Sequence, residues 1–293
     1  MIVTVTANPL LDHLAAVDLA VGQAQRVEAF RATAGGKGLN VARVLARHGH
    51  TVVACGFLGG RSGDEVADLV LADGVEPDFT RIDQPTRRGF QAIGRGGAVT
   101  TLMERGPAVG PDEQEALVRQ VVRRARDAAL VIVGGAPPAG CAMLYRQLAE
   151  ALAATRVPCW IDAYGPAMAE VLAGPVPPAL AKPNREEYGE DHRPWLAVRE
   201  LHLTAGPGQI RVRHPQGLFS VHPPPVREVN ATGSGDCYLA GLAHARLSGY
   251  GLEAQLRYAA AAGAANAARD DVAAIGPEEI EALQAAVEVV PGR

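Results

Sequence analysis

The chain has 293 residues, of which 48% are hydrophobic and 20% are charged, so it is long enough and apolar enough to form a globular core. Only 4% of the residues are aromatic, and the net charge is −4. A nucleic-acid-binding surface is not expected, because it would need basic and stacking side chains that this composition lacks.

The first hundred residues predict short strands and helices joined by glycine-rich turns. The β-branched segment 1–6 predicts a first strand, and it lacks the basic and long apolar regions of a signal peptide. We expect helices over 39–48 and 64–73, a strand over 52–58, and a hairpin of strands 88–94 and 99–104 around Gly94, Gly96 and Gly97.

After residue 112, apolar strands alternate with amphipathic helices. The expected helices cover 112–128, 141–154 and 165–173, and the expected strands cover 129–133, 157–162 and 179–182. Two strands near 200–204 and 209–213 follow, and helices at about 235–248, 252–268 and 277–288 close the chain. This alternation predicts a parallel sheet covered by helices on both faces, in one α/β domain.

The cysteine pattern and the hydropathy indicate the cellular setting. Four cysteines are scattered along the chain without a C-x-x-C motif, which argues against a disulfide framework or a zinc site. No uninterrupted apolar run approaches the length of a membrane span. We therefore expect a cytoplasmic protein with no membrane partner.

Gly35-Gly-Lys-Gly38 opens the helix expected at 39–48. A helix N-terminus directs backbone N–H groups at an anion, and Lys37 adds a positive charge. The loop lacks the second spaced glycine and the Ser or Thr of a P-loop, and no G-x-G-x-x-G motif is present to indicate a dehydrogenase. A plain turn before a helix is an equally good interpretation of this loop alone.

Gly233-Ser234-Gly235-Asp236 precedes another apolar helix. The two glycines allow several N–H groups to converge on one anionic oxygen, and the helix dipole favours an ionised Asp236. This arrangement suits proton abstraction from a hydroxyl that attacks a phosphoryl group. The alternative is an aspartate that only caps the helix.

Two further motifs follow predicted strands. Asp12, which ends Asn8-Pro-Leu-Leu-Asp12, could accept hydrogen bonds from neighbouring sugar hydroxyls or belong to an Asx turn. Asn184 and Glu187 could hold a hydrated Mg²⁺ through water, form a capping box at a helix start, or do both. Ligands of α/β sheets bind at the carboxyl ends of the strands, so these positions favour a single site.

Taken in this order, the motifs resemble the ribokinase/PfkB family of sugar kinases, and within it the tagatose-6-phosphate kinase and 1-phosphofructokinase group. The matching segments are Asn8-Pro-Leu-Leu-Asp12, Gly35-Gly-Lys-Gly-Leu-Asn-Val-Ala-Arg43, Thr86-Arg87, Glu104-Arg-Gly-Pro107, Lys182-Pro-Asn-Arg-Glu-Glu187 and Val229-Asn-Ala-Thr-Gly-Ser-Gly-Asp236. The resemblance implies a ribokinase-like three-layer α/β domain over 1–293, with a mostly parallel central sheet flanked by helices and a small β lid formed by about 8–32 and 86–106.

The same resemblance implies a role for each site residue. The catalytic base would be Asp236, beside an anion hole of Gly233, Ser234 and Gly235. The residues that hold the sugar and its phosphate would be Asp12, Gly36, Lys37, Asn40 and Arg87. The residues that serve ATP would be Lys182, Asn184, Thr204, Gly206 and Gly208, with Asn184 and Glu187 at the Mg²⁺ through water.

The implied reaction is ATP-dependent, Mg²⁺-assisted phosphoryl transfer to a hydroxyl of a ketohexose phosphate, such as fructose 1-phosphate, tagatose 6-phosphate or fructose 6-phosphate. In the family such lids close over the substrate, which excludes water that would hydrolyse ATP. Lids of this kind also pair in dimers, so a homodimer through the lid is implied.

Three positions depart from the family pattern. Gly134-Gly-Ala-Pro-Pro138 replaces the usual Ser-Gly-Ser-Leu-Pro, Gly89 replaces a commonly polar residue, and the segment between Glu187 and residue 200 is shortened. The lost serine hydroxyls leave open a kinase of an unphosphorylated sugar or nucleoside. A non-catalytic sugar- or nucleotide-binding protein is the alternative of another class.

Overall fold

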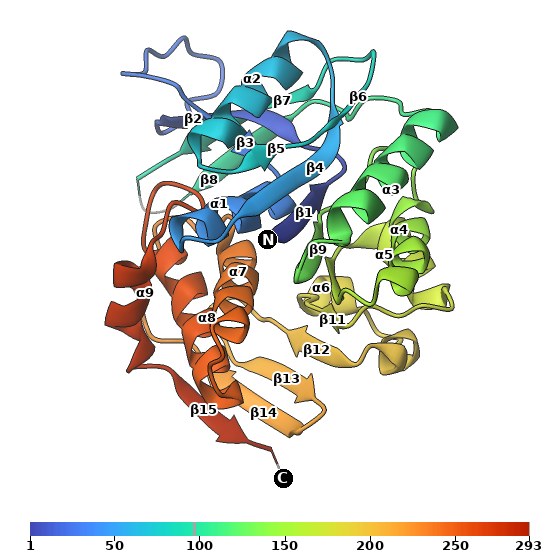
Figure 1. The fold of residues 1–293 in the computed structure, drawn as a ribbon. Helices are drawn as coiled ribbons and strands as arrows, with labels where there is room; N and C mark the ends of the chain where they lie inside the picture. The colour runs from blue at the N-terminus through green and yellow to red at the C-terminus, as the bar shows by residue number, and fades with distance from the viewer. Residues whose placement is uncertain (96–97, 293) are drawn as a thin grey trace.

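The larger of two β-sheets forms the centre of the molecule (Figure 1), and the computed structural model describes residues 1–95 and 98–292. Its strands are β1 (Ile2–Thr6), β4 (Val52–Leu58), β5 (Glu76–Pro77), β6 (Thr80–Arg81), β9 (Leu130–Gly134), β10 (Cys159–Asp162), β11 (Leu180–Ala181), β12 (Glu200–Leu203), β13 (Ile210–His214), β14 (Gly217–His222) and β15 (Glu288–Pro291). They lie in the order β15-β14-β13-β12-β11-β10-β9-β1-β4-β5, with β6 also paired to β4. Pairing is parallel from β12 to β6 and antiparallel between β12 and β15.

The buried strands point apolar side chains to both faces of this sheet. In β4, Val52 and Ala54 pack on one face, whereas Val53, Cys55 and Phe57 pack on the other. A strand covered on both faces has no reason to alternate apolar with polar residues, which explains the near-continuous apolar runs in the sequence.

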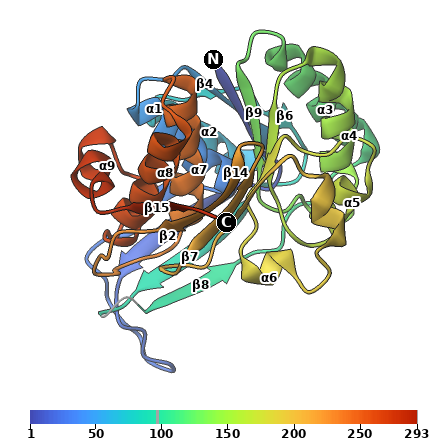
Figure 2. The ribbon, with the colours of Figure 1, turned by 90° about the horizontal axis from the view of Figure 1, so that it is seen from below.

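Helices cover each face of the sheet, as Figures 1 and 2 show. One face carries α1 (Lys37–Arg47), α2 (Gly60–Ala72), α7 (Ser234–Leu247), α8 (Leu252–Ala267) and α9 (Pro277–Gln284). The other face carries α3 (Pro111–Ala125), α4 (Leu144–Leu152) and α5 (Gly165–Ala173). The short α6 (Arg185–Tyr188) follows β11. The expectation of a mostly parallel sheet flanked by helices is therefore confirmed.

A second, four-stranded sheet stands beside the ends of the central strands. Its strands are β2 (Leu10–Ala16), β3 (Arg31–Gly35), β7 (Arg87–Ile93) and β8 (Val99–Met103), in the order β3-β2-β7-β8. β2 and β7 pair in parallel, so two segments far apart in the chain form the middle of this sheet. The antiparallel β7–β8 pairing confirms the hairpin, but Gly96 and Gly97 of its turn lie outside the described residues.

The sequence prediction is wrong at the end of the chain. The helix expected at 277–288 ends at Gln284, and Glu288–Pro291 form β15, an edge strand paired with β14. The alanines at 285–286 favour a helix, but pairing of Val289 and Val290 with β14 overrides that propensity. β14 itself was not expected from the sequence. Among the described residues, no helix has both the length and the apolar character needed to cross a membrane.

Candidate active site

A cavity of about 880 Å³ lies where the ends of the central strands meet the four-stranded sheet and α7. Thr6, Gly134 and Lys182 line it at the carboxyl ends of β1, β9 and β11. Asp162, at the end of β10, is enclosed beneath the lining. The site residues expected from the sequence that line it are Asp12, Gly36, Lys37, Asn40, Arg87, Lys182, Asn184, Glu187, Thr204, Gly206, Gly233, Ser234, Gly235 and Asp236. Gly208 does not line it. Four separate motifs thus meet in one place, as the strand-end argument predicts.

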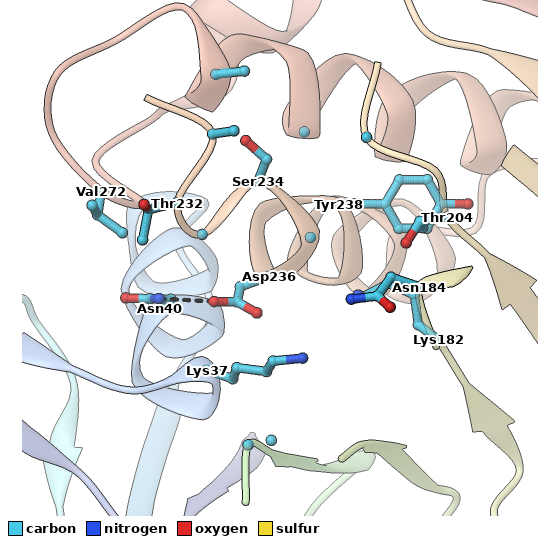
Figure 3. A pocket seen from close by; sticks show the side chains of 18 of the residues that line it. Lys37, Asn40, Lys182, Asn184, Thr204, Thr232, Ser234, Asp236, Tyr238 and Val272 are labelled. Atoms are coloured by element: carbon cyan, nitrogen blue, oxygen red, sulfur yellow. Dashed lines mark hydrogen bonds between the residues drawn. The ribbon is translucent and has the colours of Figure 1, made fainter. Parts of the chain in front are cut away.

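Asp236 lies in the first turn of α7, almost fully buried, at the middle of this cavity (Figure 3). Its Oδ2 accepts a hydrogen bond of 2.8 Å from Asn40 Nδ2, which fixes the carboxylate across from α1. Burial raises the pKa of Asp236 to about 6, against the opposing effects of the Lys37 charge and the Asn40 hydrogen bond. A carboxylate with such a pKa is ionised at neutral pH and is basic enough to take a proton.

The loop before α7 is held in a conformation that requires glycine. Gly233 has a φ of 79°, and a Cβ there would lie 2.7 Å from Val272 Cγ1. The backbone N–H groups of Ser234 and Asp236 donate to carbonyls within the loop. Across residues 1–95 and 98–292, the N–H groups of Gly233 and Gly235 have no such acceptor, so two N–H groups of this loop remain available to an anion.

Asn266, a buried residue of α8 that sequence reasoning missed, braces the same loop. Its Nδ2 donates to the carbonyl of Thr232 at 2.8 Å and to Ser234 Oγ at 3.0 Å, and its Oδ1 accepts from the N–H of Ala273. A lone amide within a run of alanines and glycines was the only signal in the sequence.

A buried ion network adjoins Asp236, and its centre, Asp162, was also missed. The Asp162 carboxylate lies 3.2 Å from Lys37 Nζ and 3.2 Å from Lys182 Nζ. Burial alone would raise the pKa of Asp162, but the two lysines hold it below its usual range. Burial likewise opposes the charge of Lys37, yet the carboxylates of Asp162, Asp236 and Glu187 raise the Lys37 pKa. Asp162 and Lys37 are therefore both ionised at neutral pH.

Asn184 and Glu187 form the capping box that the sequence predicts at the start of α6. The Asn184 N–H donates to Glu187 Oε2, and the Glu187 N–H donates to Asn184 Oδ1, both at 2.9 Å. The other carboxylate oxygen, Glu187 Oε1, lies 3.3 Å from Lys37 Nζ. The carboxylates of Asp162 and Glu187 thus both contact the Lys37 ammonium group in the cavity wall.

The end of the cavity beside the four-stranded sheet is lined by polar groups that lack partners. Asp12 Oδ2 accepts a hydrogen bond from Gln91 Nε2, and burial raises the pKa of Asp12. Within the described residues, Asp12 Oδ1, Gln91 Oε1, Arg87 Nε and Asn8 Oδ1 are buried without a hydrogen-bond partner. Buried polar atoms are almost always satisfied in folded proteins, so this end is suited to a ligand rich in hydroxyls or oxyanions.

The opposite end of the cavity is formed by loops and small residues. Thr204 follows β12 and bridges to Asn184, and Gly206 adopts a φ of 57° in the loop that follows. The lining here also includes Pro223–Val226 and the face of α8 formed by Ala260, Gly263, Ala264 and Ala267. Small side chains on α8 leave a flat, apolar wall against which a planar ring can lie.

Comparison with known proteins accords with this architecture. Residues 6–192 and 194–278 match the model of the pfkB family carbohydrate kinases. A tagatose-6-phosphate kinase of Staphylococcus epidermidis is 28% identical over 309 aligned residues, which cover 99% of each chain. A Thermotoga maritima structure described as a "Possible 1-phosphofructokinase" has a TM-score of 0.90 at 19% identity and covers 100% of this chain and 99% of its own.

Phosphofructokinase-2 from Escherichia coli has a TM-score of 0.86 at 23% identity, covering 97% of this chain and 98% of its own. At these identities the structural likeness establishes the fold. The family match spans nearly the whole chain and includes every site residue described above. The chain belongs to the pfkB family of carbohydrate kinases.

Proposed function

We propose that the protein transfers the γ-phosphoryl group of ATP to a hydroxyl of a ketohexose phosphate, with Asp236 as the base. The observation that carries this proposal is the position of Asp236. It is a buried carboxylate, held by Asn40, between a polar end suited to a sugar and an apolar end suited to a nucleotide. A base placed at that junction can reach a hydroxyl presented to a phosphoryl donor.

The reaction needs in-line positioning and charge neutralisation more than covalent chemistry. In the proposed mechanism, Asp236 Oδ1 or Oδ2 accepts the proton of the attacking hydroxyl as the new P–O bond forms and the bond to the leaving ADP oxygen breaks. The free N–H groups of Gly233 and Gly235 and the positive end of α7 stabilise charge on the transferring group, with Ser234 in the same turn.

Lys182, Asn184, Thr204 and Gly206 are proposed to bind ATP, with Gly208 supporting the loop from outside the cavity. Asn184 and Glu187 would hold a Mg²⁺ that ATP brings, through water, because both side chains line the cavity and Mg²⁺ prefers oxygen ligands. No cluster of three metal-ligating side chains occurs among the described residues, which suits an ion held mainly by phosphates and water. When bound, Mg²⁺ supplies neutralisation of phosphate charge.

The acceptor is assigned to the end with unpartnered polar atoms. Asp12 accepts from sugar hydroxyls, Gly36 allows the backbone to approach, and Asn40 and Lys37 line the path to Asp236. Arg87, whose Nε is buried and unpaired within the described residues, binds the sugar phosphate. The tagatose-6-phosphate kinase and phosphofructokinase names of the relatives support a phosphorylated ketose as substrate class.

The four-stranded sheet is proposed to act as the lid, carried by segments 8–32 and 86–106 of a single domain over 1–293. Its strands contribute Asp12, Arg87 and Gln91 to the cavity, so movement of this sheet would open or close the acceptor end. Phe30, Leu102 and Met103 on this sheet or beside it are more than half exposed. These apolar side chains support a homodimer formed through the lid.

The test is ADP release from Mg·ATP across a panel of acceptors. The panel contains fructose 1-phosphate, fructose 6-phosphate, tagatose 6-phosphate, free hexoses and nucleosides. Asp236→Asn should lower kcat on the best acceptor by about 10²–10⁴ while the protein still melts cooperatively. Asp68→Asn, on the exposed surface of α2, is the matched control and should keep wild-type turnover.

Each result discriminates between functions. Turnover of a phosphorylated ketose that is lost in Asp236→Asn supports the proposal, whereas wild-type turnover in that variant contradicts the base assignment. Turnover of unphosphorylated compounds alone would favour the second candidate, a kinase of free sugars or nucleosides, which the absence of hydroxyls from Gly134 to Ala136 supports. ATP binding without any turnover would indicate a non-catalytic binding protein.

A further inference from the structure

Tyr164 lies in the cavity at a position that no motif predicted. It is separated from the end of β10 by Ala163 and directly precedes α5, so it shares the strand-end edge with the hydroxyl-free loop Gly134–Ala136 after β9. We propose that the Tyr164 hydroxyl binds the anionic end of the acceptor, together with Arg87, and replaces the serine hydroxyls that this loop lacks. This inference rests on the proposed function and specifies how the site selects a phosphorylated acceptor.

The phenol ring of Tyr164 lines the same cavity as two cationic side chains, those of Lys37 and Arg87. Lys37 Nζ lies 5.3 Å from the ring centroid, within range of a cation–π interaction. Arg87, the first residue of β7, lines the same cavity. Tyr164 therefore shares this cavity with Lys37 of α1 and with Arg87 of the lid strand β7.

The hydroxyl of Tyr164 is available to a ligand. The residue is 43% exposed, and in the described part of the chain its hydroxyl makes no hydrogen bond to protein. The tyrosines buried nearby behave differently, because the hydroxyls of Tyr145 and Tyr238 contact Gly134 O and His202 Nδ1. A phenol that is open to the cavity can donate to an oxyanion without giving up an existing bond.

The charges of the site favour an anion at this point. Lys37 is already neutralised by Asp162 and Glu187, whereas Arg87 has no carboxylate partner among the described residues, only the carbonyl of Asn8. An incoming phosphate would meet the unpaired Arg87 Nε and the Tyr164 hydroxyl together. Hydrogen bonds to a charged acceptor are stronger than neutral ones, so the pair would favour a phosphate over a hydroxyl.

The backbone explains why the loop after β9 does not supply the hydroxyl itself. A Cβ at Gly134 would lie 2.8 Å from Gly38 N and 2.9 Å from Lys37 Cβ, so any side chain there would displace α1. Gly135 has a φ of 84°, which disfavours other residues. Of the three loop residues, only Ala136 has neither of these obstacles to a serine. A serine at this position is therefore the substitution that should restore a hydroxyl to the loop.

The experiment compares steady-state kinetics of wild-type protein, Tyr164→Phe and the double variant Tyr164→Phe/Ala136→Ser. Tyr164→Phe should raise the KM for the phosphorylated ketose roughly 10- to 100-fold, the range expected for a lost hydrogen bond to a charged group. The KM for ATP and the kcat should stay within about twofold, because Asp236 is untouched. Ala136→Ser should recover part of the affinity in the double variant, and Tyr250→Phe, which lies beyond the C-terminal end of α7 and outside the cavity lining, should have no effect.

A calorimetric measurement with fructose 1-phosphate and no ATP separates this inference from the proposed function. Weaker binding to Tyr164→Phe than to wild-type protein supports the role of Tyr164 even if no turnover occurs, in which case only the kinase reaction is wrong. An unchanged Kd and KM in Tyr164→Phe would overturn the inference and leave the kinase intact. Wild-type protein that neither binds nor phosphorylates any sugar phosphate would overturn both.

Discussion

The two halves of the cavity differ in how their polar groups are satisfied. Around Asp236, each charged group has a partner in the protein: Asn40 for Asp236, and Asp162 for both Lys37 and Lys182. At the acceptor end, buried polar atoms of Asn8, Asp12, Arg87 and Gln91 lack partners within the described residues. The charges of the catalytic half are thus paired in the free protein, although Asp162 Oδ2 and Thr6 Oγ1 have no hydrogen-bond partner in the described structure, whereas Arg87 at the acceptor end has no carboxylate partner there.

This difference has an energetic meaning. A buried polar group without a partner costs about 1–3 kcal/mol, so the acceptor half reduces the stability of the free protein. The same atoms give selectivity, because a ligand that lacks hydroxyls or a phosphate would leave them unsatisfied. The catalytic half instead uses paired charges to hold Asp236 and Lys37 in place before any substrate arrives.

The largest expected effect is on the free energy of unfolding, when the ion pairs at the centre of the catalytic half are removed. Asp162→Asn leaves Lys182, which is 4% exposed, without its carboxylate. Loss of one partner of a buried ion pair costs about 3–5 kcal/mol, and the free energy of unfolding in urea should fall by that amount. Asp127→Asn, on an exposed turn, is the matched control and should change it very little.

A second variant tests the reason for that loss. Asp162→Asn/Lys182→Met removes both charges and should be more stable than Asp162→Asn alone, because no buried charge is then uncompensated. If the double variant were less stable by the sum of both single losses, the ion pair would not be the source of the effect.

The next effect concerns the pH dependence of the rate. Asp236 must be ionised to accept a proton, and its pKa is raised to about 6. Below about pH 6, kcat/KM should therefore fall about tenfold per pH unit. A sugar phosphate also titrates near pH 6, so a variant is needed to identify the group.

Lys37→Met supplies that variant. The Lys37 charge lowers the pKa of Asp236, so its removal should move the inflection of kcat/KM to higher pH. Titration of the substrate is the same in both proteins and would leave the inflection where it was. An unmoved inflection would therefore assign the acid limb to the substrate and not to Asp236.

Local motifs were enough to predict much of the site. Asp236, Lys37 and the Asn184–Glu187 capping box each follow from a few consecutive residues whose geometry is fixed by a helix start. The parallel sheet followed from apolar runs alternating with helices. Site residues whose positions depend only on neighbours in the same turn can therefore be predicted from a single sequence.

Chemistry that depends on contacts between distant segments was not visible. Asp162 is paired with Lys37, 125 residues away, and in the sequence it is only an aspartate at a strand end. Tyr164 and Gln91 have no local motif, and their importance depends on the side chains that face them. β15 was missed for the same reason, since its partner β14 lies far along the chain.

The smallest expected effect is on the KM for the acceptor, when the one side-chain hydrogen bond that Asp12 already makes at the acceptor end is removed. Gln91→Met removes the donor that fixes Asp12 Oδ2, leaving this buried carboxylate without a side-chain partner in the described structure. Gln91 acts on the acceptor only through Asp12, so about 1 kcal/mol of binding free energy should be lost and the KM for the sugar acceptor should rise about fivefold. The Asp12 pKa should also rise, because the Gln91 hydrogen bond lowers it.

The KM for ATP should not change, and an equal rise for both substrates would mean that Gln91 supports the whole cavity and not Asp12. If the acceptor KM rose while Arg87 and Tyr164 were intact, the sugar and its phosphate would be bound by separable groups, and the acceptor half would consist of two subsites.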